Sequence, residues 1–339
     1  MMRRRIFLGV AMAGFAGALD RGLAAAQTGQ TKPFTIYRVT YRGRTEVEDG
    51  FDDYLASNGV AVRFIERNAD HDVSRLPAFV QEIRETRPDL VYTWGTPVTL
   101  GIAGRYDAPD KQKFITDIPV VFALVSTPVA SGLVADRLKP QRNLTGAVHV
   151  VPTETQLRAM HSYRPISKLG VLYTATEQNS LSIVEELRGL QQTMNFGLIE
   201  RQFHLDGEGH PTADGIEQLI ADIKEAGADW LYLLPDTFLG TQYGRVAPAA
   251  LAQHLPTFGA AELAIRQGGA LVALVSRYYS VGQLAASKAM RILRDGVPVD
   301  QIPIETLRRF SLIINMPVAK KLELYPPIDM LNYAEVLTG

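Results

Sequence analysis

The chain of 339 residues contains no cysteine. This absence excludes disulfide bonds, thiolate metal sites, cysteine nucleophiles and a lipoprotein anchor, which needs a cysteine at its cleavage site. A strong charge of either sign is also missing, because 35 Lys and Arg residues oppose 36 Asp and Glu residues. We therefore expect no nucleic-acid partner and no general binding to anionic membranes.

Familiar catalytic motifs are missing as well. The chain has no H-E-x-x-H pair, no G-x-S-x-G elbow and no phosphate-binding G-x-x-x-x-G-K-[ST] loop. Its six histidines are scattered along the chain without the spacing of metal ligands. We therefore predict a protein that is not an enzyme and that has no metal site and no cofactor.

The N-terminal residues resemble an export signal. Arg3-Arg4-Arg5 precedes an apolar run over residues 6–19, and Ala24-Ala25-Ala26 supplies small residues for cleavage. Residues 1–26 are thus predicted to be a signal peptide that directs the protein to the periplasm. The pair Arg4-Arg5 fits twin-arginine export, and an arginine-rich general secretory signal fits as well.

Strands and helices alternate after residue 33, which predicts an α/β fold with parallel strands joined by right-handed crossovers. The alternation runs through a first group of strands and restarts near residue 168. Strands are expected at residues 34–39, 60–65, 90–92, 118–124, 168–173, 198–203, 230–234 and 255–258.

The last part of the chain predicts two interleaved lobes. An apolar strand at 270–275 and a helix at 281–294 are followed by an extended segment at 302–304 and a strand at 311–314. A chain with two consecutive domains would not need this additional strand and helix followed by another extended crossing. We expect two Rossmann-like lobes joined by hinges near 146–151, 266–269 and 303–307. The predicted N-terminal lobe comprises residues 33–147 and 268–303, and the C-terminal lobe comprises residues 148–267 and 304–339.

Residues 90–99 (LVYTWGTPVT) are the stretch around which this organisation is predicted to form. A buried strand ends at Trp94-Gly95, and Thr96-Pro97 is typical of an N-cap followed by proline in the first helical turn. Ligands bind at the carboxyl ends of strands in open α/β sheets. We therefore expect the polar residues that follow the strands to converge on one cleft.

Several segments of the chain together resemble the substrate-binding proteins of ABC importers, in the branch that includes tryptophan and other amino-acid binders. The resemblance rests on residues 173–180 (YTATEQNS), 258–262 (FGAAE), 268–275, 302–306 (IPIET) and 319–322 (AKKL). It implies the type I periplasmic binding fold, with a ligand held between two lobes and no chemistry on that ligand.

The chain departs from the family at three positions that bear on the ligand. Thr174-Ala175 replaces a common Asn-Pro, Thr127 stands where an Asp is common, and Arg277 replaces an acid beside two tyrosines. With Arg42 and Arg44 at another strand end, these changes favour a carboxylate ligand without a free amine. Asp236, Glu177 or Glu262 could still hold an amine.

Each candidate ligand-binding residue also has a structural alternative, such as helix capping for the threonines and solvation for the arginines. Tyr278 and Tyr279 are interpreted as packing residues. The predicted ligand-binding residues are Arg42, Arg44, Trp94, Thr96, Ser126, Thr127, Tyr173, Glu177, Asn179, Ser180, Asp236, Thr237, Glu262 and Arg277.

These observations predict an exported, monomeric solute-binding protein that captures a small polar ligand, either an amino acid or a carboxylate. It is expected to deliver that ligand to the ABC transporter permease in the inner membrane. A different role for the same fold is a sensor that signals ligand occupancy to a membrane receptor.

Overall fold

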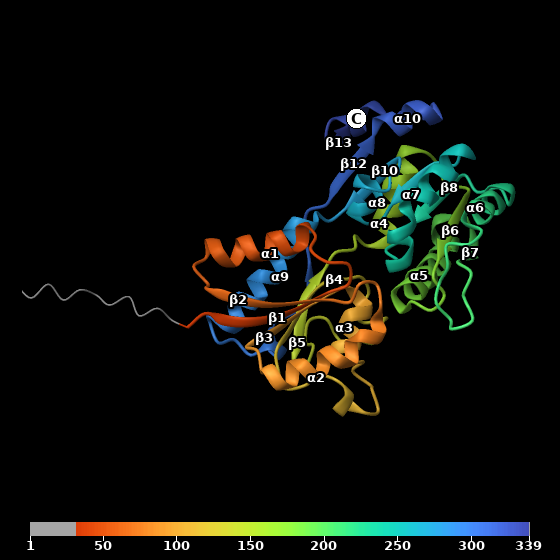
Figure 1. Ribbon diagram of the computed structural model, residues 1–339. Coiled ribbons are helices and arrows are strands. Elements are labelled where there is room, and N and C mark those ends of the chain that lie inside the picture. The colour runs from red at the N-terminus through yellow and green to blue at the C-terminus, as the bar shows by residue number, and fades with distance from the viewer. Residues whose placement is uncertain (1–31, 339) are drawn as a thin grey trace, which may run out of the picture. The chain divides into compact units, whose positions relative to one another are not determined.

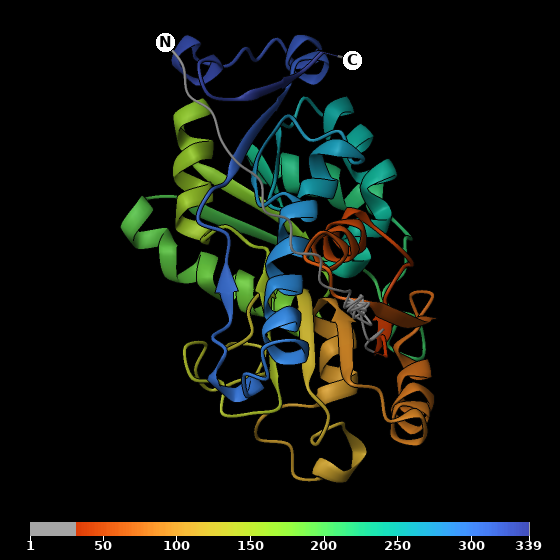
Figure 2. The ribbon, with the colours of Figure 1, turned by 90° about the vertical axis from the view of Figure 1, so that its left-hand side faces the viewer.

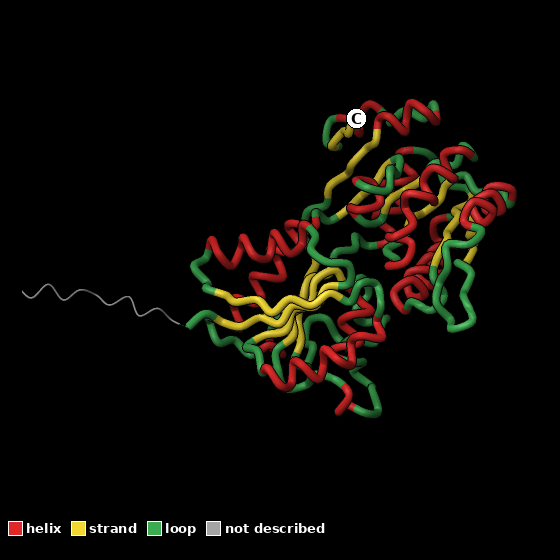
Figure 3. The backbone as a smooth tube through the Cα atoms, in the orientation of Figure 1, coloured by secondary structure: helices red, strands yellow, loops and turns green. Residues whose placement is uncertain are grey.

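The computed structural model of the protein describes residues 32–338, so the predicted signal peptide lies outside the described residues. Two β-sheets organise the described chain (Figure 3). The six-stranded sheet has the order β11-β5-β4-β3-β1-β2, and the seven-stranded sheet has the order β13-β12-β10-β9-β8-β6-β7. We call the unit around the six-stranded sheet the first lobe and the unit around the seven-stranded sheet the second lobe.

The first sheet is parallel throughout. Its strands are β1 (Phe34–Thr40), β2 (Val62–Asn68), β3 (Leu90–Trp94), β4 (Val120–Val125), β5 (Leu144–Val148) and β11 (Glu305–Thr306). In the second sheet the pairing of β10 with β12 is antiparallel and the other pairings are parallel. Its strands are β6 (Lys168–Tyr173), β7 (Gly197–Gln202), β8 (Trp230–Leu233), β9 (Thr257–Gly259), β10 (Val272–Val275), β12 (Ser311–Asn315) and β13 (Glu335–Leu337).

Helices cover both faces of the first sheet (Figure 1). Helices α1 (Glu46–Ser57) and α9 (Tyr278–Leu293) lie on one face, and α2 (Leu76–Thr86) and α3 (Gly95–Ala103) lie on the other. The remaining helices belong to the second lobe. They are α4 (Thr153–Tyr163), α5 (Gln178–Met194), α6 (Ile216–Glu225), α7 (Thr237–Ala252), α8 (Glu262–Arg266), α10 (Met316–Leu322) and α11 (Ile328–Leu331).

Helix α1 begins with a capping box. The Thr45 side chain accepts a hydrogen bond from the first turn, and the Glu48 carboxylate accepts one from the Thr45 backbone N–H at 2.8 Å. The helix packs directly on α9 through two glycines. A Cβ atom on Gly50 would lie 2.0 Å from the Tyr279 carbonyl oxygen, and one on Gly282 would lie 1.9 Å from the Val47 carbonyl oxygen. This backbone contact fixes α9 to the first lobe.

The chain passes between the lobes three times: after β5, between β10 and α9, and between β11 and β12. Figure 2 shows the blue C-terminal part of the chain running through both lobes. The first and third crossings lie near the predicted hinges. The second lies at Ser276-Arg277 rather than at residues 266–269.

Two predicted lobe boundaries differ from the sheet pairings. Strand β10 was expected in the N-terminal lobe, but it pairs with β9 and β12 in the second sheet. Strand β11 was expected in the C-terminal lobe, but it pairs with β5 in the first sheet. An apolar strand such as β10 fits the interior of either sheet, so its sequence pattern does not specify which one it joins. Within residues 32–338, no helix has the length and apolar character needed to cross a bilayer.

Candidate ligand-binding site

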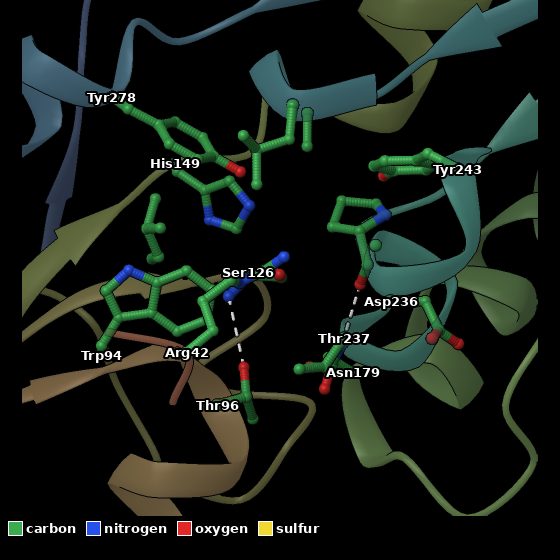
Figure 4. A pocket seen from close by; sticks show the side chains of 16 residues that line it. Arg42, Trp94, Thr96, Ser126, His149, Asn179, Asp236, Thr237, Tyr243 and Tyr278 are labelled. Carbon is green, nitrogen blue, oxygen red and sulfur yellow. Dashed lines mark hydrogen bonds between the residues drawn. The ribbon is translucent and has the colours of Figure 1, made fainter. Parts of the chain in front are cut away.

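A small cavity lies between the two lobes, at the carboxyl ends of strands from both sheets (Figure 4). Its volume is about 40 Å³, which is room for about one water molecule. A larger cavity of about 1500 Å³ adjoins it and shares Thr96, Asn179 and Thr237. The small cavity is lined by Arg42, Trp94, Gly95, Thr96, Leu124, Ser126, His149, Asn179, Pro235, Asp236, Thr237, Gly240, Tyr243, Ala261, Leu263 and Tyr278.

Arg42 is the cation of this cavity. It follows β1, and its guanidinium carbon lies 4.7 Å from the centre of the Trp94 ring. Its Nε is buried without a hydrogen-bond partner, and no ion pair of Arg42 is found within residues 32–338. The neighbouring Arg44, by contrast, pairs with Asp49 and Asp52 at 2.8 Å each. Arg42 is thus available to an anion that enters from the cleft.

The start of α3 supplies free backbone donors beside this cation. The helix begins at Gly95, two residues earlier than the sequence predicts, and its N-cap Trp94 makes no capping hydrogen bond through its side chain. Thr96 is therefore not the N-cap. Its hydroxyl accepts a hydrogen bond from the Ser126 N–H at 3.5 Å. An uncapped helix N-terminus favours negative charge.

A bulge at the end of β4 shapes the same wall. Ala123 pairs with Ala147 and Val125 pairs with Val148, which leaves Leu124 between them without a partner. Leu124 has a φ of 58°, which is unusual for a residue with a side chain. Bulges redirect the residues that follow them, and here the bulge precedes Ser126 in the cavity wall.

His149 contributes a neutral ring to the cavity. Burial lowers the pKa of His149 to about 3, and its Nδ1 has no partner among the described residues. Its ring meets Tyr278 edge to face, with 6.1 Å between the ring centres. At neutral pH this side of the cavity is therefore aromatic and uncharged apart from Arg42.

Asp236 makes its hydrogen bonds within the second lobe. Its carboxylate caps α7 by accepting a hydrogen bond from the Leu239 N–H at 2.8 Å. It also accepts hydrogen bonds from the Thr174 N–H at 2.7 Å and the Ser180 hydroxyl at 2.8 Å. Both oxygens are engaged, and Figure 4 shows the side chain turned away from Arg42. Asp236 therefore acts on the cavity mainly through its charge.

Glu177 and Asn179 present the acceptors of this lobe. Glu177 accepts a hydrogen bond from the Thr237 N–H at 2.8 Å, and burial together with the nearby Asp236 raises the pKa of Glu177 to about 8. Asn179 is 3% exposed and donates to the Pro235 carbonyl oxygen at 2.7 Å, whereas its Oδ1 has no partner. In residues 32–338 neither Glu177 nor Asp236 is found in an ion pair.

Glu177 lines the larger cavity rather than the small one, and the remaining predicted residues do not line the small cavity either. Arg277 donates to Glu262 at 2.8 Å and pairs with Glu335, so both Arg277 and Glu262 belong to an ion-pair network at the second crossing. The Tyr173 hydroxyl donates to Glu200, and Ser180 lies behind Asp236. Thr127 follows Ser126, and its buried hydroxyl has no partner.

His149, Tyr243 and Tyr278 line the cavity although they were not predicted. His149 follows β5 and therefore fits the rule about strand ends. Tyr278 begins α9, where an adjacent pair of tyrosines is more often a packing feature. Tyr243 lies in the second turn of α7, and no pattern in the sequence directs it to a site.

Comparison with known proteins identifies the family. The ABC transporter substrate binding protein family matches residues 36–337. The chain belongs to this family. The family consists of solute-binding proteins rather than enzymes. Its members bind small molecules for ABC transporters outside the cytoplasm.

Known members resemble this substrate-binding protein in sequence and structure. A tyrosine-binding protein from Clostridioides difficile is 25% identical over 272 residues, covering 80% of this chain and 73% of the relative. A conserved domain protein from Vibrio cholerae has a TM-score of 0.78 at 22% identity, covering 91% of this chain and 100% of that one. A protein from Streptococcus pneumoniae in complex with L-Trp has a TM-score of 0.77 at 20% identity, covering 90% of this chain and 100% of that one.

The shared architecture is the type I periplasmic binding fold, as the sequence predicts. In this substrate-binding protein, the cavity between the lobes occupies the place where ligands bind in open α/β sheets.

Proposed function

We propose that this substrate-binding protein captures an aromatic amino acid between its lobes and delivers it to the permease of an ABC importer. The observation that carries the proposal is the guanidinium of Arg42, which lies on Trp94 in the cavity between the lobes with Nε unpartnered. An arginine in such a place can bind both oxygens of a carboxylate.

The first lobe is suited to the ligand carboxylate. Arg42, the uncapped N-terminus of α3 and the Ser126 residue beside it all favour negative charge or offer donors. The N-terminus of α7 on the second lobe is not equivalent, because Asp236 and Glu177 already accept hydrogen bonds from its first turn. A carboxylate therefore gains more on the first lobe.

The second lobe is suited to the ligand ammonium group. The Asn179 Oδ1 is an acceptor without a partner among the described residues. The carboxyl groups of Glu177, which accepts hydrogen bonds from Thr237, and of Asp236 also have no cationic partner within residues 32–338. The sequence argument for a ligand without an amine used Arg277 together with Thr127, Arg42 and Arg44. Of these, Arg277 is neutralised by Glu262 and Glu335, and Arg44 pairs with Asp49 and Asp52. Opposite polarities on the two lobes thus favour a zwitterionic amino acid.

The aromatic residues of the cavity support a ligand with a flat side chain. Trp94, Tyr243 and Tyr278 surround the cation, and aromatic rings favour offset or edge contacts with other rings. The tyrosine-binding relative and the L-Trp complex agree with this ligand class.

The ligand is proposed to act by a shift between open and closed forms. The cavity of about 40 Å³ beside Arg42 cannot hold a whole aromatic amino acid, so the ligand must extend into the adjoining larger cavity or be accommodated by movement of the lobes. A ligand that contacts both lobes stabilises a closed form, which the permease then recognises. Export to the periplasm would precede this step, by the twin-arginine or the general secretory route.

Calorimetric titration of the mature protein tests the proposal. L-tyrosine and L-tryptophan are compared with 3-phenylpropionate, which has no amine, and with tyramine, which has no carboxylate. We expect the amino acids to bind at least about tenfold more tightly than either analogue. If 3-phenylpropionate binds as tightly as the amino acids, the ligand amine is not recognised. If tyramine binds as tightly as the amino acids, the ligand carboxylate is not recognised and Arg42 does not have the proposed role.

A further inference from the structure

We propose that Gly240, by lacking a side chain, leaves space on the second lobe for the Arg42 guanidinium. We further propose that this close approach couples recognition of the ligand carboxylate to lobe closure. The inference rests on the proposed function and deepens it, because it names a residue that sets specificity without itself touching the ligand carboxylate.

Arg42 of the first lobe reaches across the cavity to helix α7. A Cβ atom on Gly240 would lie 3.3 Å from Nη1, 3.4 Å from Nη2 and 3.8 Å from Cζ of Arg42. These are the nearest atoms to that position, and all of them belong to one side chain of the other lobe. The lack of a side chain at residue 240 therefore leaves space for the guanidinium.

Neither backbone conformation nor core packing accounts for this glycine. Gly240 is the fourth residue of α7 and is not among the residues with positive φ. Its N–H makes an ordinary helical bond to the Asp236 carbonyl oxygen at 3.0 Å. Glycine is less favourable than alanine within a helix, and at residue 240, unlike at residue 244 of the same helix, the space that a Cβ atom would take is bordered by Arg42.

The guanidinium consequently lies between the Trp94 ring on the first lobe and α7 on the second. Its two terminal nitrogens lie beside α7 in this form, and no hydrogen bond or ion pair from Arg42 to the second lobe is found within residues 32–338. A carboxylate that pairs with them is bound at once by a group in contact with both lobes, which favours the closed form.

Helix α7 offers a matched control in Gly244, one turn further on. A Cβ atom on Gly244 would meet nothing within 4 Å. Alanine and leucine are introduced separately at each position, and affinity for L-tyrosine and L-tryptophan is measured together with thermal stability. Gly240→Ala and Gly244→Ala should raise the unfolding midpoint similarly, since both improve helix propensity.

Affinity should separate the two positions. We expect Gly244→Ala and Gly244→Leu to bind within about twofold of the wild type, Gly240→Ala to bind about threefold more weakly, since a small shift of Arg42 admits a methyl group, and Gly240→Leu at least about tenfold more weakly. If the Gly240 variants bind as tightly as their Gly244 counterparts, the proposed role of Gly240 in accommodating Arg42 is wrong.

A double-mutant cycle identifies the partner of Gly240. In an Arg42→Ala background, Gly240→Leu should cause little further loss of affinity, because the displaced side chain is gone. A full further loss would contradict the inference, since leucine would then act on the ligand or on the helix. If the wild type binds ligands in a carboxylate-dependent way and the affinity of the Gly240 variants is unchanged, this inference is wrong and the proposed function stands. A wild type that binds no amino acid overturns the proposed function with it.

Discussion

At the scale of single residues, the cavity keeps groups that folding alone does not use. Arg42 Nε and Asn179 Oδ1 lack partners, and Glu177 is held beside another carboxylate. Leaving such groups partly buried and unpaired lowers the free energy of unfolding. This cost is offset when a ligand brings the complementary charges, which is the expected behaviour of a site prepared for a zwitterion.

Glu177 predicts a specific pH dependence. Its pKa is raised from 4.5 to about 8 in the ligand-free protein, so the folded state holds a proton that the unfolded chain loses. The stability from Glu177 is fully present below pH 4.5 and is lost as the pH rises through about 8. An ammonium ligand favours the ionised carboxylate. Affinity for L-tryptophan should therefore rise about tenfold between pH 6.5 and 8.5.

Two comparisons accompany this titration. Glu177→Gln should remove most of the rise, and 3-phenylpropionate should not show it, because that compound has no ammonium group. A wild-type affinity for L-tryptophan that stays constant over the same range would show that Glu177 does not titrate against the ligand.

Sequence reasoning reached part of the cavity at this scale and missed part of it. Trp94 ends β3, and Ser126 and Asp236 follow strands, so their approximate place is a property of parallel sheets. Arg277 follows a strand as well, but its partners Glu262 and Glu335 are distant along the chain. Tyr243 projects from the second turn of a helix, and its direction depends on how that helix packs.

At the scale of elements, the close packing of α1 on α9 decides how the returning chain joins the first lobe. Their backbones approach at Gly50 and Gly282, where no side chain would fit. The sequence pattern predicted a helix at 281–294, which corresponds to α9. It did not predict that α1 and α9 pack on each other, because the pattern contains no information about distant partners.

Gly50→Ala should therefore destabilise the protein. Its Cβ would lie 2.0 Å from the Tyr279 carbonyl oxygen, so the helices must separate, and we expect the free energy of unfolding to fall by about 3 kcal/mol. Chemical denaturation measures this change. Gly189→Ala in α5, where nothing lies within 4 Å, should instead stabilise by about 0.5 kcal/mol. Equal effects of the two substitutions would contradict the packing argument.

At the scale of the whole described chain, an ion-pair network ties the crossings together. Arg277 at the second crossing bonds Ser311 beside the third crossing at 3.1 Å, Glu262 of α8 at 2.8 Å, and Glu335 of β13. Glu262 is 3% exposed and also accepts a hydrogen bond from the Tyr278 N–H. The network connects the crossings to the last strand of the second sheet, and Arg277 and Glu262 themselves do not line the ligand cavity.

Arg277→Met should consequently affect stability rather than specificity. It removes one of the two cationic partners of the buried Glu262, which keeps Arg266 at 3.2 Å, so the free energy of unfolding should fall by about 1.5 kcal/mol. Arg188→Met, which breaks more exposed pairs with Glu185 and Glu200, should cost about 0.5 kcal/mol. The preference of Arg277→Met for a carboxylate ligand should match that of the wild type. Loss of that preference would make Arg277 the carboxylate partner.

The most direct test of the proposed site compares an amino acid with its α-carboxamide in the wild type and in Arg42→Ala, by calorimetry. A charged hydrogen-bonded pair is worth roughly 1.5–3 kcal/mol, so the wild type should prefer L-tryptophan over L-tryptophanamide by about 100-fold. In Arg42→Ala this preference should fall to within about threefold, whereas Arg44→Ala should retain it. A preference that survives in Arg42→Ala would contradict the assignment of Arg42 as the group that binds the ligand carboxylate.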